Sequence, residues 1–74
     1  ARAAAARKRL EALTGREREV VIAAARGLSN AEIGDELHMS EATVKAHMSR
    51  VLAKLALSNR VQAAILVHDA GLLD

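Results

Sequence analysis

The chain has 74 residues, of which 51% are hydrophobic and none is aromatic, cysteine or proline, and its formal net charge is +2. A chain of this length supports a single domain, whose core is limited here to aliphatic side chains, alanine and methionine. The lack of cysteine excludes disulfides and thiolate metal sites, and no apolar run approaches the roughly 20 residues that a membrane span requires.

Residues 1–12 are rich in alanine and in basic residues. Alanine gives this stretch a strong helix propensity, but it offers little apolar surface to bury. Its cations are Arg2, Arg7, Lys8 and Arg9. We interpret residues 1–12 as a basic, alanine-rich linker that precedes a domain at residues 13–74; an arm that contacts phosphate is the alternative.

A first helix is predicted from about residue 15 to 26. Thr14 and Glu17 have the spacing of a capping box, in which the two residues satisfy each other's backbone amides. Gly27 stands where helices commonly end in a left-handed residue. We also expect Glu17 to form an ion pair with Arg60, between the first and last helices.

A second, two-turn helix begins at Ser29 or Asn30 and ends near Leu37. Only residues 38–40 separate it from the next helix. So short a connection is typical of the steep crossing of a helix-turn-helix, and Gly34 has no side chain to obstruct the close approach of the two helices.

Ser40 caps a third helix, expected at about residues 41–55, with two dissimilar faces. At about 100° per residue, one narrow apolar stripe faces the core; it consists of Val44, Met48, Val51 and Leu55. The opposite face carries small residues and two cations but no acid; it consists of Ala42, Lys45, Ala46, Ser49, Arg50 and Ala53. Such a face fits the major groove of DNA, and an ordinary solvated face is the alternative.

A fourth helix is predicted from about residue 60 to 70, with Gly71 at its end. One side suits the core, whereas Val61, Ile65 and His68 form a second stripe that is left facing solvent. Four short helices joined by short turns predict an all-α fold, a compact four-helix bundle that contains a helix-turn-helix.

The histidines do not indicate a metal site or an active site. His38, His47 and His68 lack the spacing of metal ligands and have no cysteine partner, and His47 flanks the core stripe. The sequence also lacks a nucleophile–base–acid set and a glycine-rich phosphate loop. We therefore expect no metal, no cofactor and no enzymatic activity.

Four blocks of the sequence, in order and at the right spacing, resemble the LuxR-type (GerE-like) DNA-binding domain, as in the C-terminal effector domain of NarL/FixJ-type response regulators. The blocks are LT-x-REREV, GLSNAEI, SEATVKAH and R-x-x-A, and the resemblance covers residues 13–72. It implies that the chain binds double-stranded DNA as the output domain of a bacterial transcriptional regulator. The third helix would read the major groove as one half of a dimer on a two-half-site operator.

The resemblance also assigns DNA contacts to individual residues. The lysine of the TVK block contacts DNA in the family and maps onto Lys45, and two base-facing positions map onto Ala46 and Ser49. Positions that approach phosphates map onto Thr43 and Asn30.

Physical chemistry supports further phosphate contacts. The backbone amides that open the second and third helices, the latter capped by Ser40, suit phosphate oxygens by partial charge and geometry. Arg50 and Lys54, further along the third helix, can neutralise backbone charge without specifying sequence.

The family dimerises through the last helix, so Val61, Ile65 and His68 are predicted to line a small two-fold contact that is weak without DNA. The resemblance further implies an N-terminal regulatory domain of a two-component system and a cytoplasmic location in bacteria, on the nucleoid when bound to DNA. RNA polymerase is a further candidate partner, and the membrane is not one.

The sequence departs from the family pattern at three positions that bear on stability. Gly15 replaces a usual proline, and Ala56 and His38 stand where glycine is common, so that a left-handed backbone at residue 56 would be mildly strained.

Two other functions remain open at the level of sequence. Region four of a sigma factor has similar motifs in the same order, although the apolar helix expected within residues 58–72 favours the LuxR type. A helical protein-interaction adaptor that binds no DNA is the third hypothesis, and it predicts that Lys45→Ala has no effect on activity.

Overall fold

The computed structural model describes residues 1–73, and its helices are α1 (Arg2–Leu10), α2 (Gly15–Ala25), α3 (Asn30–Leu37), α4 (Glu41–Leu55) and α5 (Arg60–Asp69). The predicted all-α fold class is confirmed, and the four expected helices are α2 to α5. The fifth, α1, forms within the basic N-terminal stretch. None of these helices combines the length and the apolar character that crossing a membrane requires. Residue 74, at the end of the predicted domain, lies outside the described residues.

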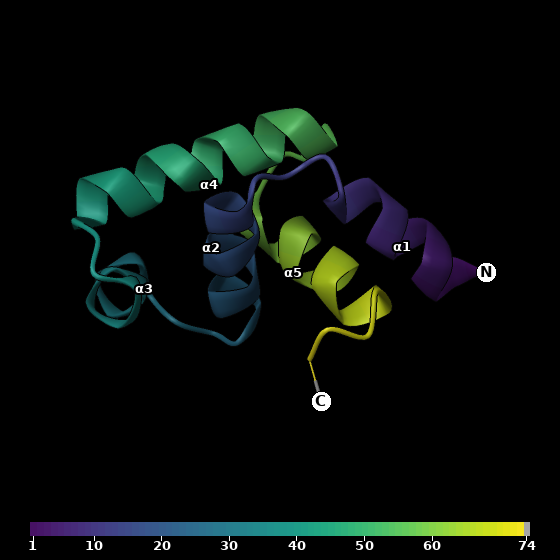
Figure 1. Cartoon of the computed structure of the whole chain (residues 1–74), viewed down its shortest axis with the longest axis horizontal. Coiled ribbons are helices and arrows are strands. Elements are labelled where there is room, and N and C mark those ends of the chain that lie inside the picture. The colour runs from purple at the N-terminus through teal and green to yellow at the C-terminus, as the bar shows by residue number, and fades with distance from the viewer. Residues whose placement is uncertain (74) are drawn as a thin grey trace.

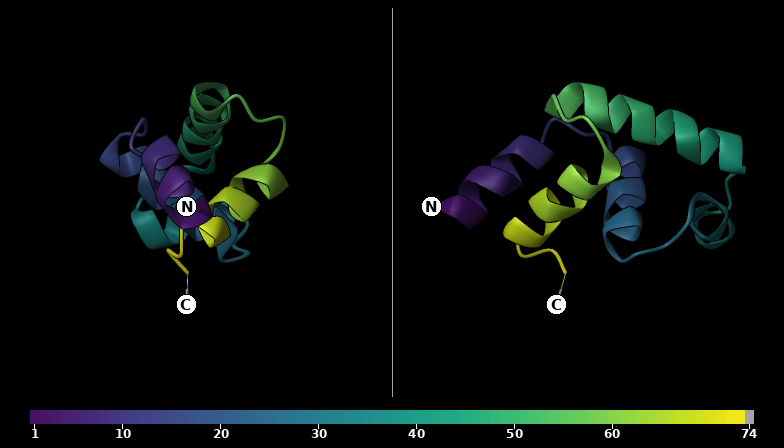
Figure 2. Two further views of the ribbon diagram at one scale, coloured as in Figure 1. Left: turned by 90° about the vertical axis from the view of Figure 1, so that its right-hand side faces the viewer. Right: turned by 180° about the vertical axis from the view of Figure 1, so that it is seen from behind.

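The longest helix, α4, runs along one edge of the molecule, with the other described helices on the same side of it (Figure 1). Views from the side and from behind show the same arrangement (Figure 2). At the centre, α2 contacts α3, α4 and α5, whereas α1 packs on α5. One long side of α4 is therefore left uncovered by the other described helices.

The core has two parts, and α4 contributes to both. One part joins α2, α3 and α4 through Val20, Ala23, Ile33, Val44 and Met48. The other joins α1, α2, α4 and α5 through Ala6, Leu10, Val21, Val51, Leu55, Ala63, Leu66, Val67 and Ala70. Each fully buried aliphatic side chain of this kind contributes about 1.5–3 kcal/mol by leaving water. Consequently α4 is fixed to the core along its whole length.

Side-chain caps define where four of the helices begin. The N-cap residues of α2 to α5 are Thr14, Ser29, Ser40 and Asn59, and each accepts a hydrogen bond from the backbone amide three residues on. The capping box of Thr14 and Glu17 is confirmed, and α3 has a second one, between Ser29 and Glu32. Of the two candidate caps of α3, Ser29 is the one used.

The turn between α3 and α4 depends on two backbone features. His38 has the left-handed conformation, with φ 58° and ψ 47°, and the Met39 amide donates to the Gly34 carbonyl at 2.9 Å. A Cβ atom on Gly34 would lie 2.5 Å from the Met39 carbonyl oxygen. The expected reason for glycine at position 34 is confirmed, and α3 and α4 cross steeply (Figure 1).

The end of α4 is also left-handed. Ala56 has φ 55° and ψ 43°, a conformation that costs an L-residue roughly 1–2 kcal/mol relative to the right-handed one. This agrees with the strain expected at a position where glycine is common.

Apolar contacts fix α1 on the rest of the domain. Ala6 is 4% exposed and Leu10 is fully buried, and both lie in the core part that includes α5. The stretch therefore buries more than its alanine-rich sequence suggests. The division into an arm at residues 1–12 and a domain at 13–74 stays a prediction.

Polar contacts from α1 reach the C-terminal ends of two other helices. Arg9 Nη2 donates to the Leu55 carbonyl at 2.6 Å, and Arg7 Nε donates to the Ala70 carbonyl at 2.9 Å. The last carbonyls of a helix lack partners within that helix and carry partial negative charge, so an arginine there stabilises it. By these contacts α1 braces the ends of α4 and α5.

Candidate nucleic-acid interface

The helix α4 has one buried face and one exposed face on opposite sides, as the apolar spacing predicted. Every residue of the predicted apolar stripe is 7% exposed or less. The opposite face is exposed throughout, and consists of Ala42, Lys45, Ala46, Ser49, Arg50 and Ala53. Since the buried face is held by both parts of the core, the exposed face is presented on a rigid helix.

Three predicted DNA-contacting residues lie close together on this exposed face. Lys45 and Ser49 are one helical turn apart, and Ala46 lies beside them; all three are exposed. The group offers an ammonium donor, a hydroxyl that donates and accepts, and a methyl group. Because two of the three side chains are small, a partner can approach the backbone of α4 closely here.

At the beginning of α4, Ser40 and Thr43 are joined by two hydrogen bonds. The Thr43 amide donates to Ser40 Oγ at 3.1 Å, and Ser40 Oγ donates to Thr43 Oγ1 at 2.8 Å. Since Thr43 Oγ1 accepts in this pair, its own hydroxyl hydrogen remains able to donate to an outside oxygen. Both residues are exposed.

Asn30, at the first turn of α3, is held by an arginine of α5. Arg60 donates from Nη1 to Asn30 Oδ1 and from Nη2 to the Leu28 carbonyl, both at 2.9 Å. The predicted ion pair of Arg60 with Glu17 is therefore wrong, because the guanidinium is engaged at α3. The side-chain NH₂ group of Asn30 is left as a donor.

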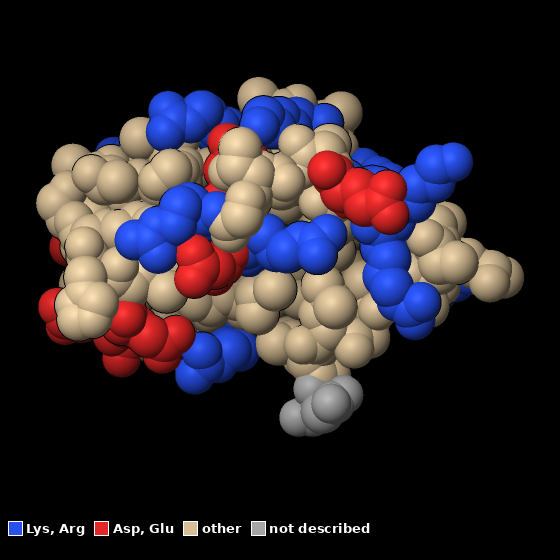
Figure 3. All heavy atoms as spheres, in the orientation of Figure 1, with Lys and Arg blue, Asp and Glu red and all other residues tan. Residues whose placement is uncertain are grey.

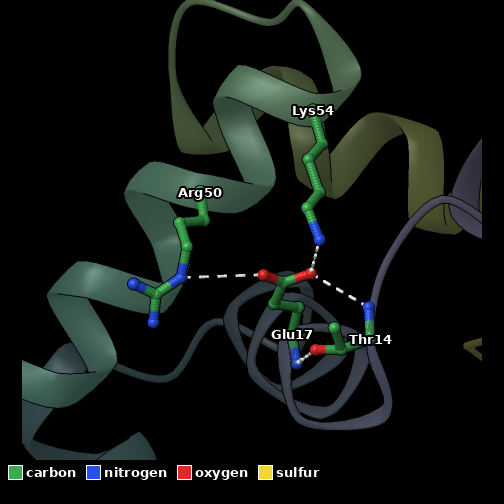
Figure 4. Close-up of polar contacts among 4 residues, drawn as sticks. All are labelled: Thr14, Glu17, Arg50 and Lys54. Atoms are coloured by element: carbon green, nitrogen blue, oxygen red, sulfur yellow. Dashed lines mark hydrogen bonds and ion pairs between the residues drawn. The ribbon is translucent and has the colours of Figure 1, made fainter.

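The carboxylate of Glu17 instead pairs with two cations of α4 (Figure 4). Lys54 Nζ lies 2.7 Å from Oε1, and Arg50 Nε lies 3.7 Å from Oε2. The Thr14 amide also donates to Oε1 at 2.9 Å. Arg50 and Lys54, both predicted to neutralise DNA, thus have a protein anion within reach.

The surroundings of Glu17 keep it charged although its side chain is only 4% exposed. The hydrogen bond from Lys54, followed by that from the Thr14 amide, lowers the pKa of Glu17 below its ordinary value, against the opposing effect of burial. No spacing in the sequence indicates this cluster, because the beginning of α2 and the end of α4 meet only through the fold.

The charges on the surface are unevenly distributed. Lys and Arg side chains lie along the edge that α4 forms, whereas acidic side chains gather over α3 (Figure 3). The exposed acidic residues of α3 are Glu32, Asp35 and Glu36. An anionic partner is therefore attracted to the α4 edge more than to the α3 side.

A separate apolar surface lies on α5. Val61 is 64% exposed and Ile65 is 51% exposed, and His68 is also exposed. His68 further lines an open groove of about 730 Å³ between α2 and α5, together with Ile22 and Leu72. The predicted second stripe of this helix is thus on its solvent side.

The histidines and acidic residues form no metal site in the part of the chain that the structure describes, since no three such side chains come together in a way that could hold an ion. His47 is half-buried beside the core stripe, where the sequence placed it, and its Nδ1 is buried without a hydrogen-bond partner.

Comparison with known proteins adds an independent observation. The sequence model described as "Bacterial regulatory proteins, luxR family" matches residues 11–67. The chain is 47% identical over 64 residues to the transcriptional regulatory protein LiaR of Bacillus subtilis. The matched region covers 86% of this chain and 30% of that protein. It is 49% identical over 53 residues to the transcriptional regulatory protein LnrK of the same organism, covering 72% of this chain and 24% of that protein.

A third relative is the response regulator protein VraR of Staphylococcus aureus. The identity is 41% over 63 residues, which covers 85% of this chain and 30% of that protein. The chain thus spans less than a third of the length of each of these relatives.

Proposed function

We propose that this chain binds a specific DNA sequence by placing α4 in the major groove. The chain belongs to the luxR family of bacterial regulatory proteins and is a DNA-binding domain of transcription regulation. One observation carries this proposal. The exposed face of α4 is made of small and basic side chains, and the helix lies along an edge that no other described helix covers. The major groove admits one helix of this kind.

In this arrangement, sequence is read by the middle of α4. Lys45 can donate to guanine O6 or N7 or to a phosphate, and Ser49 can donate to or accept from a base edge. Ala46 offers a methyl group to a thymine methyl and lets the backbone come close. The specificity of the domain depends on these three side chains.

Phosphate contacts position the helix. Ser40 and Thr43 bring the first amides of α4 and one hydroxyl donor to a phosphate, and Asn30 brings its NH₂ group and the first amides of α3. Arg50 and Lys54 are the remaining candidate phosphate contacts of this region, and each must give up its ion pair with Glu17 before it can neutralise a phosphate.

Dimerisation is assigned to α5. Val61 and Ile65 expose apolar surface one turn apart, and His68 continues the stripe. The same residues on a second copy of the chain would form a small two-fold contact, weak in isolation and completed on two half-sites. The region-four alternative is disfavoured because α5 is an apolar helix with Ala63 and Val67 fully buried.

The relatives also support a proposal about the full-length protein to which this domain would belong. One of them is named a response regulator, and the chain corresponds to less than a third of its length. We therefore assign an N-terminal regulatory domain, a two-component signal and a place in the bacterial cytoplasm, on the nucleoid when DNA is bound. RNA polymerase is the candidate partner of the bound regulator. The proposal includes no catalytic step and no cofactor.

Selection of bound duplexes from a random pool, near physiological salt, tests the proposed function. Two similar half-sites with centres about one helical turn apart, or a multiple of it, are expected. A single unrepeated motif would contradict the dimer. A pool that is not enriched at all would contradict sequence-specific binding.

A further inference from the structure

We propose that Glu17 is a positioning residue that keeps Lys54 on α2 while α4 is bound to DNA, so that only Arg50 of the two cations passes to a phosphate. This inference rests on the proposed function, since it concerns which cations of α4 neutralise DNA. It predicts that a buried carboxylate outside the DNA-contacting face limits the electrostatic affinity of the domain.

The two cations are held unequally. Lys54 Nζ makes a hydrogen bond of 2.7 Å to Glu17 Oε1, and its side chain is 37% exposed. Arg50 Nε lies 3.7 Å from Oε2, and its side chain is 56% exposed. A charge-assisted hydrogen bond at the shorter distance is stronger than an ion pair at the longer one. Lys54 is therefore the firmly held partner and Arg50 the loosely held one.

Glu17 cannot easily lose Lys54. Its side chain is 4% exposed, so water cannot take the place of the ammonium group, and an unpaired buried carboxylate is costly. If Arg50 leaves, by contrast, Lys54 and the Thr14 amide still donate to Glu17 Oε1, and Oε2 loses only the longer 3.7 Å contact. A move of Lys54 to a phosphate would exchange one ion pair for another and leave Glu17 with the Thr14 amide and only the longer contact to Arg50.

The positions around α4 agree with this division. At about 100° per residue, Lys54 lies about 80° from Ala46 and so on the flank of the exposed face. Arg50 lies about 40° from Ala46, nearer to the middle of that face. The flank that carries Lys54 is turned toward the beginning of α2 (Figure 4). Arg50 can thus reach a groove wall without rotation of the helix.

The salt dependence of binding reports how many phosphates the protein neutralises. Each neutralised phosphate contributes about −0.9 to the slope of log K against log salt concentration. Glu17→Gln removes the charge and keeps the capping box, because glutamine serves at this position as glutamate does. We expect the substitution to release Lys54 and to steepen the slope by about 0.9, with tighter binding to an unrelated duplex.

Two further variants isolate the effect of Lys54. Glu36→Gln changes the net charge equally and also breaks an ion pair, with Arg26 at 2.9 Å, between the end of α2 and α3; its slope should equal that of the wild type. The double variant Glu17→Gln/Lys54→Gln should return the slope to the wild-type value.

Two results would overturn the inference. One is a folded Glu17→Gln chain whose slope matches the wild type. The other is a Glu17→Gln/Lys54→Gln chain whose slope is shallower than that of the wild type by about 0.9, since Lys54 would then contact phosphate already in the wild type. All slopes are measured on an unrelated duplex as well as on the selected one. A wild-type chain without sequence preference contradicts the proposed function, while the slopes on the unrelated duplex still decide the role of Glu17.

Discussion

At Gly34, the backbone of α3 lies close to the backbone of the turn into α4. A Cβ atom at this position would lie 2.5 Å from the Met39 carbonyl oxygen, which is backbone and cannot rotate aside. Overpacking of this kind costs about 1–3 kcal/mol, and the better helix propensity of alanine recovers up to about 1 kcal/mol. We expect Gly34→Ala to lower the free energy of unfolding by about 1–2 kcal/mol, as measured by urea denaturation.

Gly15→Ala is the matched control for this substitution. Gly15 also lies in a helix, and nothing lies within 4 Å of the corresponding Cβ position. Its free energy of unfolding should therefore stay the same or rise. Equal stability of the two variants would contradict the close contact at Gly34.

Glu17 and Glu32 make the stability of the fold dependent on pH. The pKa of Glu17 is lowered chiefly by the hydrogen bond from Lys54, and that of Glu32 by the hydrogen bond from the Ser29 amide. A carboxyl whose pKa is lower in the folded chain stabilises the fold above its ordinary value of 4.5, and this contribution is lost as the pH falls through the folded value.

We therefore expect the free energy of unfolding to fall on acidification below pH 4.5. In Glu17→Gln/Glu32→Gln the decline should be smaller, because neither side chain titrates. Urea denaturation over a series of pH values measures both profiles. Parallel profiles for the two chains would show that these carboxyls are not linked to folding.

At the residue scale, the sequence predicts local contacts better than distant ones. The capping box of Thr14 and Glu17 is confirmed, because three residues of chain fix its geometry. The ion partner of Glu17 is mispredicted as Arg60, since several cations could reach the beginning of α2 and only the crossing of α2 with α4 selects Lys54 and Arg50.

At the element scale, α2 to α5 could be predicted from caps, apolar spacing and short turns, but the docking of α1 could not. Its sequence offers only Ala6 and Leu10 at core spacing among alanines and cations. That pattern does not distinguish a docked helix from a solvated one. The pocket that takes Leu10 is built from α2, α4 and α5, so it exists only after those helices have assembled.

Leu10→Ala measures how strongly α1 is attached. Leu10 is fully buried, and leucine-to-alanine substitutions in a core cost about 2–5 kcal/mol. We expect a loss in that range in urea denaturation. Leu72→Ala is the control, because Leu72 is 36% exposed and surface substitutions usually stay within about 0.5 kcal/mol. Equal losses for the two variants would show that α1 does not pack in the core.

At the scale of the whole molecule, two surfaces can act together, the exposed face of α4 and the apolar stripe of α5. Ile65→Asp places a charge in the middle of that stripe, where Ile65 is 51% exposed, so the monomer should fold. Binding to a duplex with two half-sites should weaken by about tenfold or more, which corresponds to at least about 1.4 kcal/mol. Binding to a single half-site should not change.

Gln62→Glu is the matched control, since it adds the same charge to α5 outside the stripe at an exposed position. Gel-shift titrations on the two duplexes compare the variants. If Ile65→Asp binds both duplexes as the wild type does, the dimer contact lies elsewhere.

The arrangement of the helices can be predicted from the sequence where the turns between them can be predicted. The three-residue turn at 38–40 and Gly34 indicate the steep crossing that puts α4 on an edge. The exposure of Lys45, Ala46 and Ser49 was likewise predictable from helical periodicity. What periodicity could not supply is the competition for Arg50 and Lys54, because it arises between helices.

The most direct test of the account is the affinity of Lys45→Ala for the selected duplex, measured beside Lys8→Ala, which removes the same charge from an exposed position on α1. With α4 in the major groove, Lys45→Ala should lose about 1–3 kcal/mol of specific binding while remaining folded, and Lys8→Ala should lose much less. A folded Lys45→Ala chain that binds the duplex as tightly as the wild type would contradict the placement of α4.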